Sequence, residues 1–338
     1  MADRRDIDEI IGAAGAYRRW ALEARKKYID LRLRQDREIR ALYLRAARRV
    51  AEMIKAMALT TITNYLRQKQ LEEIETALLA EAERMAGELN TAMRNYIEEA
   101  VEAGSWYSQA ILFELFRRAN LDTGGLVSLF GAINRQAIEA CWARTRKGLF
   151  LSDRIWKQGE TFRSAMKEII QDAVATGQDA VTTARVLEKY VKDGARTLAR
   201  KYPNMMKRMA GRIPKDLSYE ALRLARTEMT AAFGEGTILA ARVLPSYRGM
   251  KWVLSKSHPM PDICDTLADH DEGLGRGVYS PGNEPPFPAH PNCLCTLVPV
   301  HEEPEDFVKR LKRWKGNPMS EPKIEEWYQN IYRKGGGV

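Results

Sequence analysis

The sequence predicts a mainly α-helical protein with a small α+β domain near its C-terminus, and this domain carries a Cys/His-rich loop. Apolar residues recur every three or four positions over long stretches without proline, which is typical of helices packed on one face. Two short segments at 250–254 and 296–300 have the character of strands. Three of the four cysteines and all four histidines fall between residues 252 and 301.

The composition limits the class of protein. The chain has 338 residues, of which 45% are hydrophobic, so it can bury a sizeable core. Its formal net charge of +9 suits an acidic partner such as nucleic acid and suits a solvated basic surface equally well. No stretch approaches the roughly 20 apolar residues of a membrane span, and the N-terminus lacks the apolar core of a signal peptide. We therefore expect neither a membrane segment nor a secreted disulfide scaffold.

Residues 1–150 are predicted to form an N-terminal helical arm or bundle. The stretch from about 15 to 66 predicts one or two long helices with one apolar face, formed by Ile39, Leu42, Ala46, Val50, Met53 and Met57. The opposite face carries five arginines that are candidate contacts for nucleic acid, namely Arg34, Arg37, Arg45, Arg48 and Arg49. The alternative is an ordinary solvated basic face.

Further helices are expected in this first segment. A helix over about 70–103 is acidic early, so it can pair with the basic helix before it. Gly104 and Ser105 are predicted to end it, and separate helices follow over 106–118 and about 126–147.

Residues 151–301 form the predicted second domain, and residues 302–338 a helical tail that looks mobile. Ser152 is a candidate N-cap for a helix, and a short helix follows over 181–190. The basic segment 193–216 contains Pro203, Gly211 and Pro214, which predicts an exposed connector. A helix over 217–242 precedes the two strand-like segments.

The Cys/His-rich loop is a candidate metal site. Zinc takes four Cys or His ligands in structural sites, and four of five residues here would supply them: His258, Cys264, His290, Cys293 and Cys295. The spacing Cys293-x-Cys295 is tighter than the usual knuckle, so two alternatives stay open. Cys264 can pair with Cys293 or Cys295 as a disulfide, or the thiols can be packed as small hydrophobic groups.

A metal-dependent nuclease or hydrolase is the alternative function. The same loop supplies carboxylates and an imidazole, namely Asp262, Asp265, Asp269, His270, Asp271 and Glu272. However, the sequence contains no H-E-x-x-H, no G-x-S-x-G and no Walker A motif. These residues alone identify no catalytic residue, and the nuclease or hydrolase alternative stays open at this point.

Several motifs follow one another in a characteristic order. They are RLARTEMTAAFGEG at 223–236, the pair Lys251–Trp252, SHPMPDICD at 257–265 and GVYSPGNEPPFPAHPNCLC at 277–295. In this order they resemble the C-terminal domain of the phage head morphogenesis family, the Mu F-like minor head proteins of tailed phages. The resemblance covers roughly 153–301 and identifies 151–301 as the expected minor head domain.

The resemblance implies a structural role without catalysis. Members of this family are minor capsid components of the virion that associate with the portal and assist head assembly, and some influence DNA packaging or ejection. The implied partners are the portal protein, the major capsid or scaffold protein, and packaged DNA bound without sequence preference. The implied location is the head interior at the portal vertex, and the host cytoplasm during assembly. The Cys/His cluster would be a fold-holding element, with structural zinc as the candidate cofactor.

Overall fold

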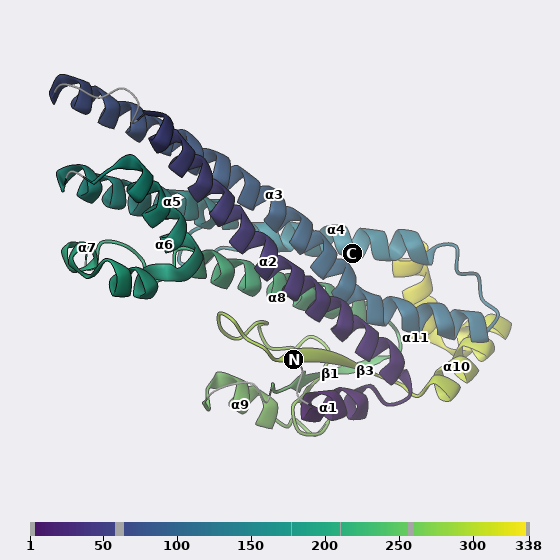
Figure 1. Cartoon of the computed structure of the whole chain (residues 1–338). Helices are drawn as coiled ribbons and strands as arrows, with labels where there is room; N and C mark the ends of the chain where they lie inside the picture. The colour runs from purple at the N-terminus through teal and green to yellow at the C-terminus, as the bar shows by residue number, and fades with distance from the viewer. Residues whose placement is uncertain (1–3, 58–63, 177, 210, 256–259, 336–338) are drawn as a thin grey trace. The chain divides into compact units, whose positions relative to one another are not determined.

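The computed structural model describes residues 4–57, 64–176, 178–209, 211–255 and 260–335, and it confirms a mainly helical chain with a small sheet (Figure 1). The chain forms two compact units built from discontinuous segments. The first unit consists of Met1–Arg32, Asn95–Ala143 and Arg226–Val338, and the second of Leu33–Arg94 and Arg144–Ala225. Both units draw on residues from either side of position 150. The division into 1–150, 151–301 and 302–338 stays a prediction.

The N-terminal half is made of long helices. The chain forms α1 (Arg4–Ala14), one 3-10 turn (Gly15–Tyr17), α2 (Arg18–Met57), α3 (Asn64–Arg118) and α4 (Leu126–Ala143). The predicted apolar face of α2 is confirmed for Ile39, Leu42, Ala46 and Val50, which are buried. Met57 lies among the residues whose side chains are not described.

The predicted helix end at Gly104 and Ser105 is wrong, because α3 continues through both residues. A Cβ atom at Gly104 would lie 2.1 Å from the carbonyl oxygen of Phe233 in α8 (Tyr219–Arg242). The hydroxyl of Thr237 donates hydrogen bonds to the carbonyls of Gly104 and Phe233, at 3.3 and 2.8 Å. Glycine is therefore used here for close helix packing rather than for ending a helix.

Helices α5 (Leu151–Ala175), α6 (Ala180–Lys201) and α7 (Pro203–Arg208) belong to the second unit. The expected N-cap at Ser152 is wrong by two residues. The helix begins at Leu151 with Phe150 in the cap position, and the Asp153 carboxylate accepts a hydrogen bond from the Phe150 amide at 3.0 Å.

The expectation of an exposed connector over 193–216 is also wrong. The segment continues α6 through a kink at Gly194, whose φ of 76° suits glycine, and then forms α7. The guanidinium of Arg208 donates two hydrogen bonds to the buried carboxylate of Asp172, at 2.7 and 2.8 Å. The Tyr190 hydroxyl donates to the Pro214 carbonyl at 2.8 Å. These contacts join the basic segment to helices that precede it in the sequence, a feature that local composition does not reveal.

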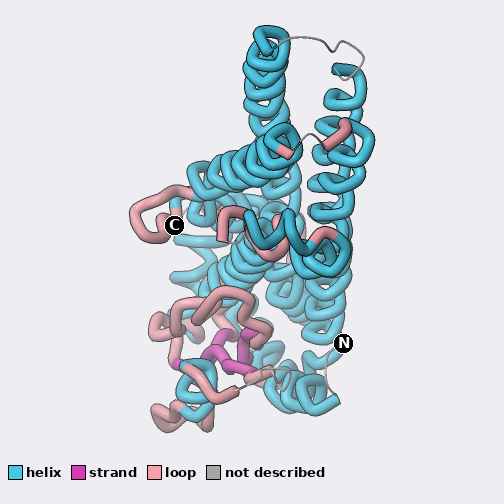
Figure 2. Tube along the Cα trace, turned by 60° about the vertical axis from the view of Figure 1, so that its left-hand side comes forward, coloured by secondary structure: helices cyan, strands magenta, loops and turns pink. Residues whose placement is uncertain are grey.

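The sheet belongs to the first unit and follows α8. It contains β1 (Tyr247–Val253), β2 (Val278–Tyr279) and β3 (Thr296–His301) in the order β2-β1-β3, with both pairings antiparallel. This confirms the two predicted strands, and Trp252 of β1 lies opposite Leu297 of β3. Between β1 and β3 the chain forms only the short helix α9 (Ile263–Asp269) and β2 among the described residues. Figure 2 shows the irregular loops beside the strands.

The C-terminal segment packs on the core of the first unit rather than standing free. It forms α10 (Pro304–Gly316), a 3-10 turn (Pro318–Ser320), α11 (Pro322–Trp327) and a π-helical turn (Tyr328–Tyr332). The indole nitrogen of Trp327 donates to the carbonyl of Val243, and its ring meets that of Phe116 edge-on. Among the described residues no helix has both the length and the apolar composition required to cross a bilayer.

A histidine of the first unit is partly buried among aromatic rings. His301 ends β3, and its ring is surrounded by the rings of Tyr17, Tyr107 and Tyr247 at centroid distances of 5.8, 5.7 and 6.0 Å. Its Nδ1 lies 3.1 Å from the hydroxyl of Ser246, while Nε2 has no partner among the described residues. Desolvation by burial, with a smaller contribution from the positive charge of Arg248, lowers the pKa of His301 to about 3. His301 is therefore a neutral core residue.

This burial predicts a stability that depends on pH. The unfolded chain binds a proton at His301 below about pH 6.5, while the folded chain does not do so until about pH 3. The stabilising effect is thus present above pH 6.5 and is lost as the pH falls toward 3, by at most about 1.4 kcal/mol per pH unit. We expect His301→Phe to reduce the pH dependence of the unfolding free energy, measured by urea titration between pH 7.5 and 4.5. Equal slopes in wild type and His301→Phe would contradict the prediction.

Candidate metal centre

The start of α9 positions the first cysteine of the cluster. Asp262 caps this helix, and its Oδ1 accepts a hydrogen bond from the amide of Cys264 at 2.7 Å. The carboxylate of Asp265 in turn accepts from the amide of Asp262 at 2.8 Å, which completes a reciprocal capping box. The cap fixes the first turn of a short helix, and the thiol of Cys264 is fully buried there.

Two thiols and one imidazole come together in the part of the chain that the structure describes. Ligand atoms of Cys264, His290 and Cys293 all lie within 4.8 Å of one another. The two sulfur atoms are 3.7 Å apart. Two thiolates bound tetrahedrally to one zinc ion at about 2.3 Å would lie about 3.8 Å apart. The observed separation fits ligands of one metal ion, whereas a disulfide requires about 2.05 Å. The group can therefore hold a metal ion.

Cys295 lies beside this group and is also buried. The neighbouring thiol of Cys293, followed by burial, raises the pKa of the Cys295 thiol. The carbonyl of Leu294, between the two cysteines, accepts a hydrogen bond from Arg25 of α2 at 3.2 Å. Arg25 is a residue that the sequence did not suggest, because nothing in the local pattern of α2 marks a contact with residue 294.

Asp262 connects two members of the group. While Oδ1 accepts from the Cys264 amide, Oδ2 lies 3.2 Å from Nε2 of His290. The other ring nitrogen of His290 lies 3.0 Å from the carbonyl oxygen of Pro291. A carboxylate that orients a ligating histidine is a common supporting partner in metal sites. The sequence offered a signal for the capping role, since an acid at 262 is followed by another three positions later.

The thiols are not suited to nucleophilic chemistry on their own. Burial raises the pKa of the Cys264 thiol, and the pKa of the Cys295 thiol is raised as well. Both are therefore neutral near pH 7, whereas a nucleophilic cysteine needs an accessible thiolate. A bound metal cation reverses this preference for the neutral thiol, because a thiol that coordinates a metal releases its proton.

The remaining histidines of the window have different roles. His258 lies outside the described residues, so its candidacy as a ligand stays a prediction. His270 stacks on Tyr279 at 4.5 Å and is outside the group. His301 packs against the rings of Tyr17, Tyr107 and Tyr247. Of the five predicted ligands, the structure thus places three in one group, while Cys295 is buried two residues from Cys293 and lies outside that group.

The loop that carries the cluster contacts α8 directly. Asn292 adopts a positive φ of 61°, which asparagine tolerates better than most residues. Its amide donates a hydrogen bond to the hydroxyl of Thr227 at 3.2 Å. A Cβ atom at Gly234 of α8 would lie 2.3 Å from the ring of Phe287, so glycine is needed where this loop packs. The motifs at 223–236 and 277–295 are therefore in contact.

The predicted basic face of α2 belongs to the second unit, where most of its arginines have acidic partners. Arg49 donates to the carboxylate of Glu81 at 2.6 and 2.8 Å, and Arg45 lies 3.5 Å from Glu88. Weaker pairs join Arg34 to Glu38 and Arg48 to Glu188, at 4.0 and 3.9 Å. The pairs of Arg49 with Glu81 and of Arg45 with Glu88 confirm the expected pairing between the basic helix α2 and the acidic helix α3. The contact of these arginines and Arg37 with nucleic acid stays a prediction.

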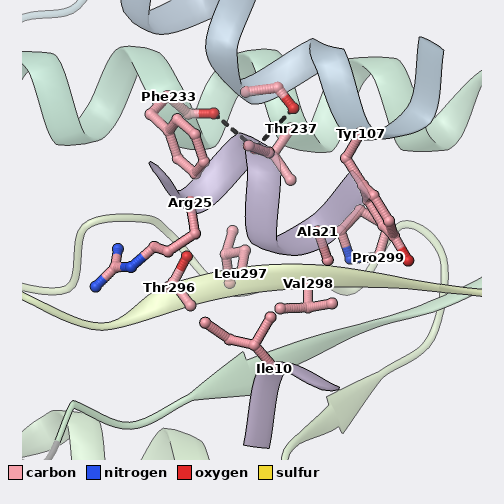
Figure 3. A pocket seen from close by; sticks show the side chains of 12 residues that line it. Ile10, Ala21, Arg25, Tyr107, Phe233, Thr237, Thr296, Leu297, Val298 and Pro299 are labelled. Carbon is pink, nitrogen blue, oxygen red and sulfur yellow. Dashed lines mark hydrogen bonds between the residues drawn. The ribbon is translucent and has the colours of Figure 1, made fainter. Parts of the chain in front are cut away.

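A small cavity in the first unit lies under β3 and does not extend the site. Figure 3 shows Arg25, Tyr107 and Phe233 around it, together with apolar side chains of β3. Its volume is about 20 Å³, which is room for about one water molecule. It is therefore too small for an organic substrate.

The cluster predicts unequal effects of removing single thiols. We expect Cys293→Ser and Cys295→Ser to lower the free energy of unfolding by about 2 kcal/mol or more, because each disturbs the contacts of the loop. Cys141→Ser, which replaces a buried cysteine of α4, serves as the matched control and should cost about 1 kcal/mol. Urea titrations of the three variants give the comparison. Equal losses in all three would show that the cluster does not hold the loop.

Comparison of the chain with models of known families, with curated proteins and with solved structures finds no match.

Proposed function

We propose that the chain is a structural minor head protein of a tailed phage, associated with the portal during head assembly. The proposal rests on the resemblance of its motifs to the Mu F-like minor head proteins. One observation supports it above the others. A hydrogen bond joins the motif at 223–236 to the motif at 277–295, from Asn292 to Thr227, two residues that are 65 positions apart in the sequence. Motifs that carry a family resemblance are expected to form one structural element.

The cofactor we propose is zinc in a structural role. Thiolate and imidazole donors suit zinc better than magnesium or calcium, which prefer oxygen ligands. Cys264, His290 and Cys293 would supply three ligands, and Cys295, a buried thiol two residues from Cys293, would supply the fourth. Four protein ligands close the site, which is the pattern of structural zinc.

The alternative, a metal-dependent nuclease or hydrolase, requires a different fourth ligand. A catalytic zinc keeps one position for water, so Cys295 would stay outside the coordination sphere. Asp262 is a carboxylate in contact with the group, but it is occupied with the Cys264 amide and the His290 ring. This favours a supporting role for Asp262 over that of a general base.

The proposed partners follow from the resemblance. The portal protein is the main one, with the major capsid or scaffold protein as further candidates and packaged DNA as a contact without sequence preference. The place we propose is the head interior at the portal vertex, reached from the host cytoplasm during assembly.

Co-purification with the portal protein encoded in the same genome tests the proposal. We expect a tagged portal ring to retain the full chain, whereas a portal ring from an unrelated phage should not retain it. A parallel assay would incubate the purified protein with duplex DNA, with and without a chelator. Failure to bind its own portal would count against the structural role. Chelator-sensitive cleavage of the DNA would contradict it and favour the nuclease.

A further inference from the structure

A basic recess lies on the first unit, away from the cysteine cluster in the sequence. Its volume is about 360 Å³, and its lining comes from the end of α8, the start of β1, α10 and α11. Four cationic side chains contribute to this lining, namely Arg242, Arg248, Arg310 and Lys323. Leu244, Pro245 and Trp327 supply its apolar part. The sequence did not suggest this site, because the four cations are spread over some 80 residues.

Carboxylates hold the three guanidinium groups in place. Glu284, whose side chain is fully buried, accepts from Nε of Arg242 at 3.1 Å. Glu302 accepts from Arg248 and, at 2.8 Å, from Nη1 of Arg310. Nε of Arg310 also donates to Glu321 at 2.9 Å. Arginines fixed in this way are pre-organised, so little side-chain entropy is lost when a ligand binds.

Hydrogen-bond donors remain on each of these cations. Glu284 accepts hydrogen bonds from Nε and Nη2 of Arg242. Glu302 accepts from Nη2 of Arg248 and Nη1 of Arg310, and Glu321 accepts from Nε of Arg310. The other terminal nitrogen of each guanidinium has no acceptor among the described residues. Lys323 is exposed and forms no ion pair with any described residue.

The charge balance of the recess favours an anion. Four cations line the recess, whereas three carboxylates pair with them, and one of these acids, Glu321, also pairs with Arg313 outside the lining. A phosphate group has several oxygens that accept hydrogen bonds from donors converging from different directions. Arginine is the residue that most often recognises such groups.

We propose that this recess binds a phosphate group, either of a free phosphate ester or of a nucleic-acid backbone. Arg242, Arg248, Arg310 and Lys323 are the ligands, and the buried acids position the arginines. The inference does not depend on the proposed portal association or on a metal ion, because none of its residues belongs to the cysteine cluster.

The test uses the full chain and two probes. Deoxyadenosine monophosphate is titrated by calorimetry, and a fluorescent duplex of mixed sequence is titrated by anisotropy at several salt concentrations. The variant is Lys323→Gln, which removes one cation without breaking any ion pair. The matched control is Lys312→Gln on α10, an exposed lysine with the same charge change that does not line the recess. Thermal melts verify that both variants fold.

We expect Lys323→Gln to weaken binding roughly tenfold and Lys312→Gln to leave it nearly unchanged. For the duplex, the slope of log affinity against log salt should fall by about 1 in Lys323→Gln alone. Binding of the monophosphate would identify a free phosphate ester as a ligand, and binding of the duplex alone would identify the backbone. The proposal is overturned if neither probe binds, or if the two variants weaken binding equally, since binding would then follow net charge only.

Discussion

The irregular segment between β1 and β3 depends on the contact between the thiols of Cys264 and Cys293, whose sulfur atoms lie 3.7 Å apart. Among the described residues between 254 and 295, regular structure is limited to the short helix α9 and the two-residue strand β2. A segment of this length with so little regular structure needs another source of stability. The cysteine contact joins α9 to the loop before β3, and Asp262 adds His290 to the same point.

The cluster also determines how the loop meets the helices. Cys293 and Cys295 flank Leu294, whose carbonyl accepts from Arg25 of α2. Asn292, one residue earlier, donates to Thr227 of α8. If the thiols separated, both contacts would lose the residues that position them. The loop segment 277–295 and the α8 segment 223–236, on which the proposed function rests, therefore meet at this point.

The sequence predicted the features that local periodicity and residue type control. The apolar face with Ile39 and Leu42, the two main strands and the group of Cys264, His290 and Cys293 are examples. It failed where distant residues decide the outcome. Gly104 continues a helix because Phe233 packs against it, and residues 193–216 fold because Arg208 reaches Asp172. The sequence also did not predict the basic recess or the contact of Arg25, because the residues involved become neighbours only in the folded chain.

The most direct test of the proposed metal site is to identify the atoms that coordinate the bound metal ion. X-ray absorption spectroscopy of the purified chain measures these atoms, together with metal content by mass spectrometry. A closed structural site predicts one zinc ion per chain with three sulfur ligands and one nitrogen ligand, at about 2.3 and 2.0–2.1 Å. Absence of stoichiometric metal would contradict the account, and so would two sulfur ligands with an oxygen in the fourth position, which is the pattern of a catalytic site.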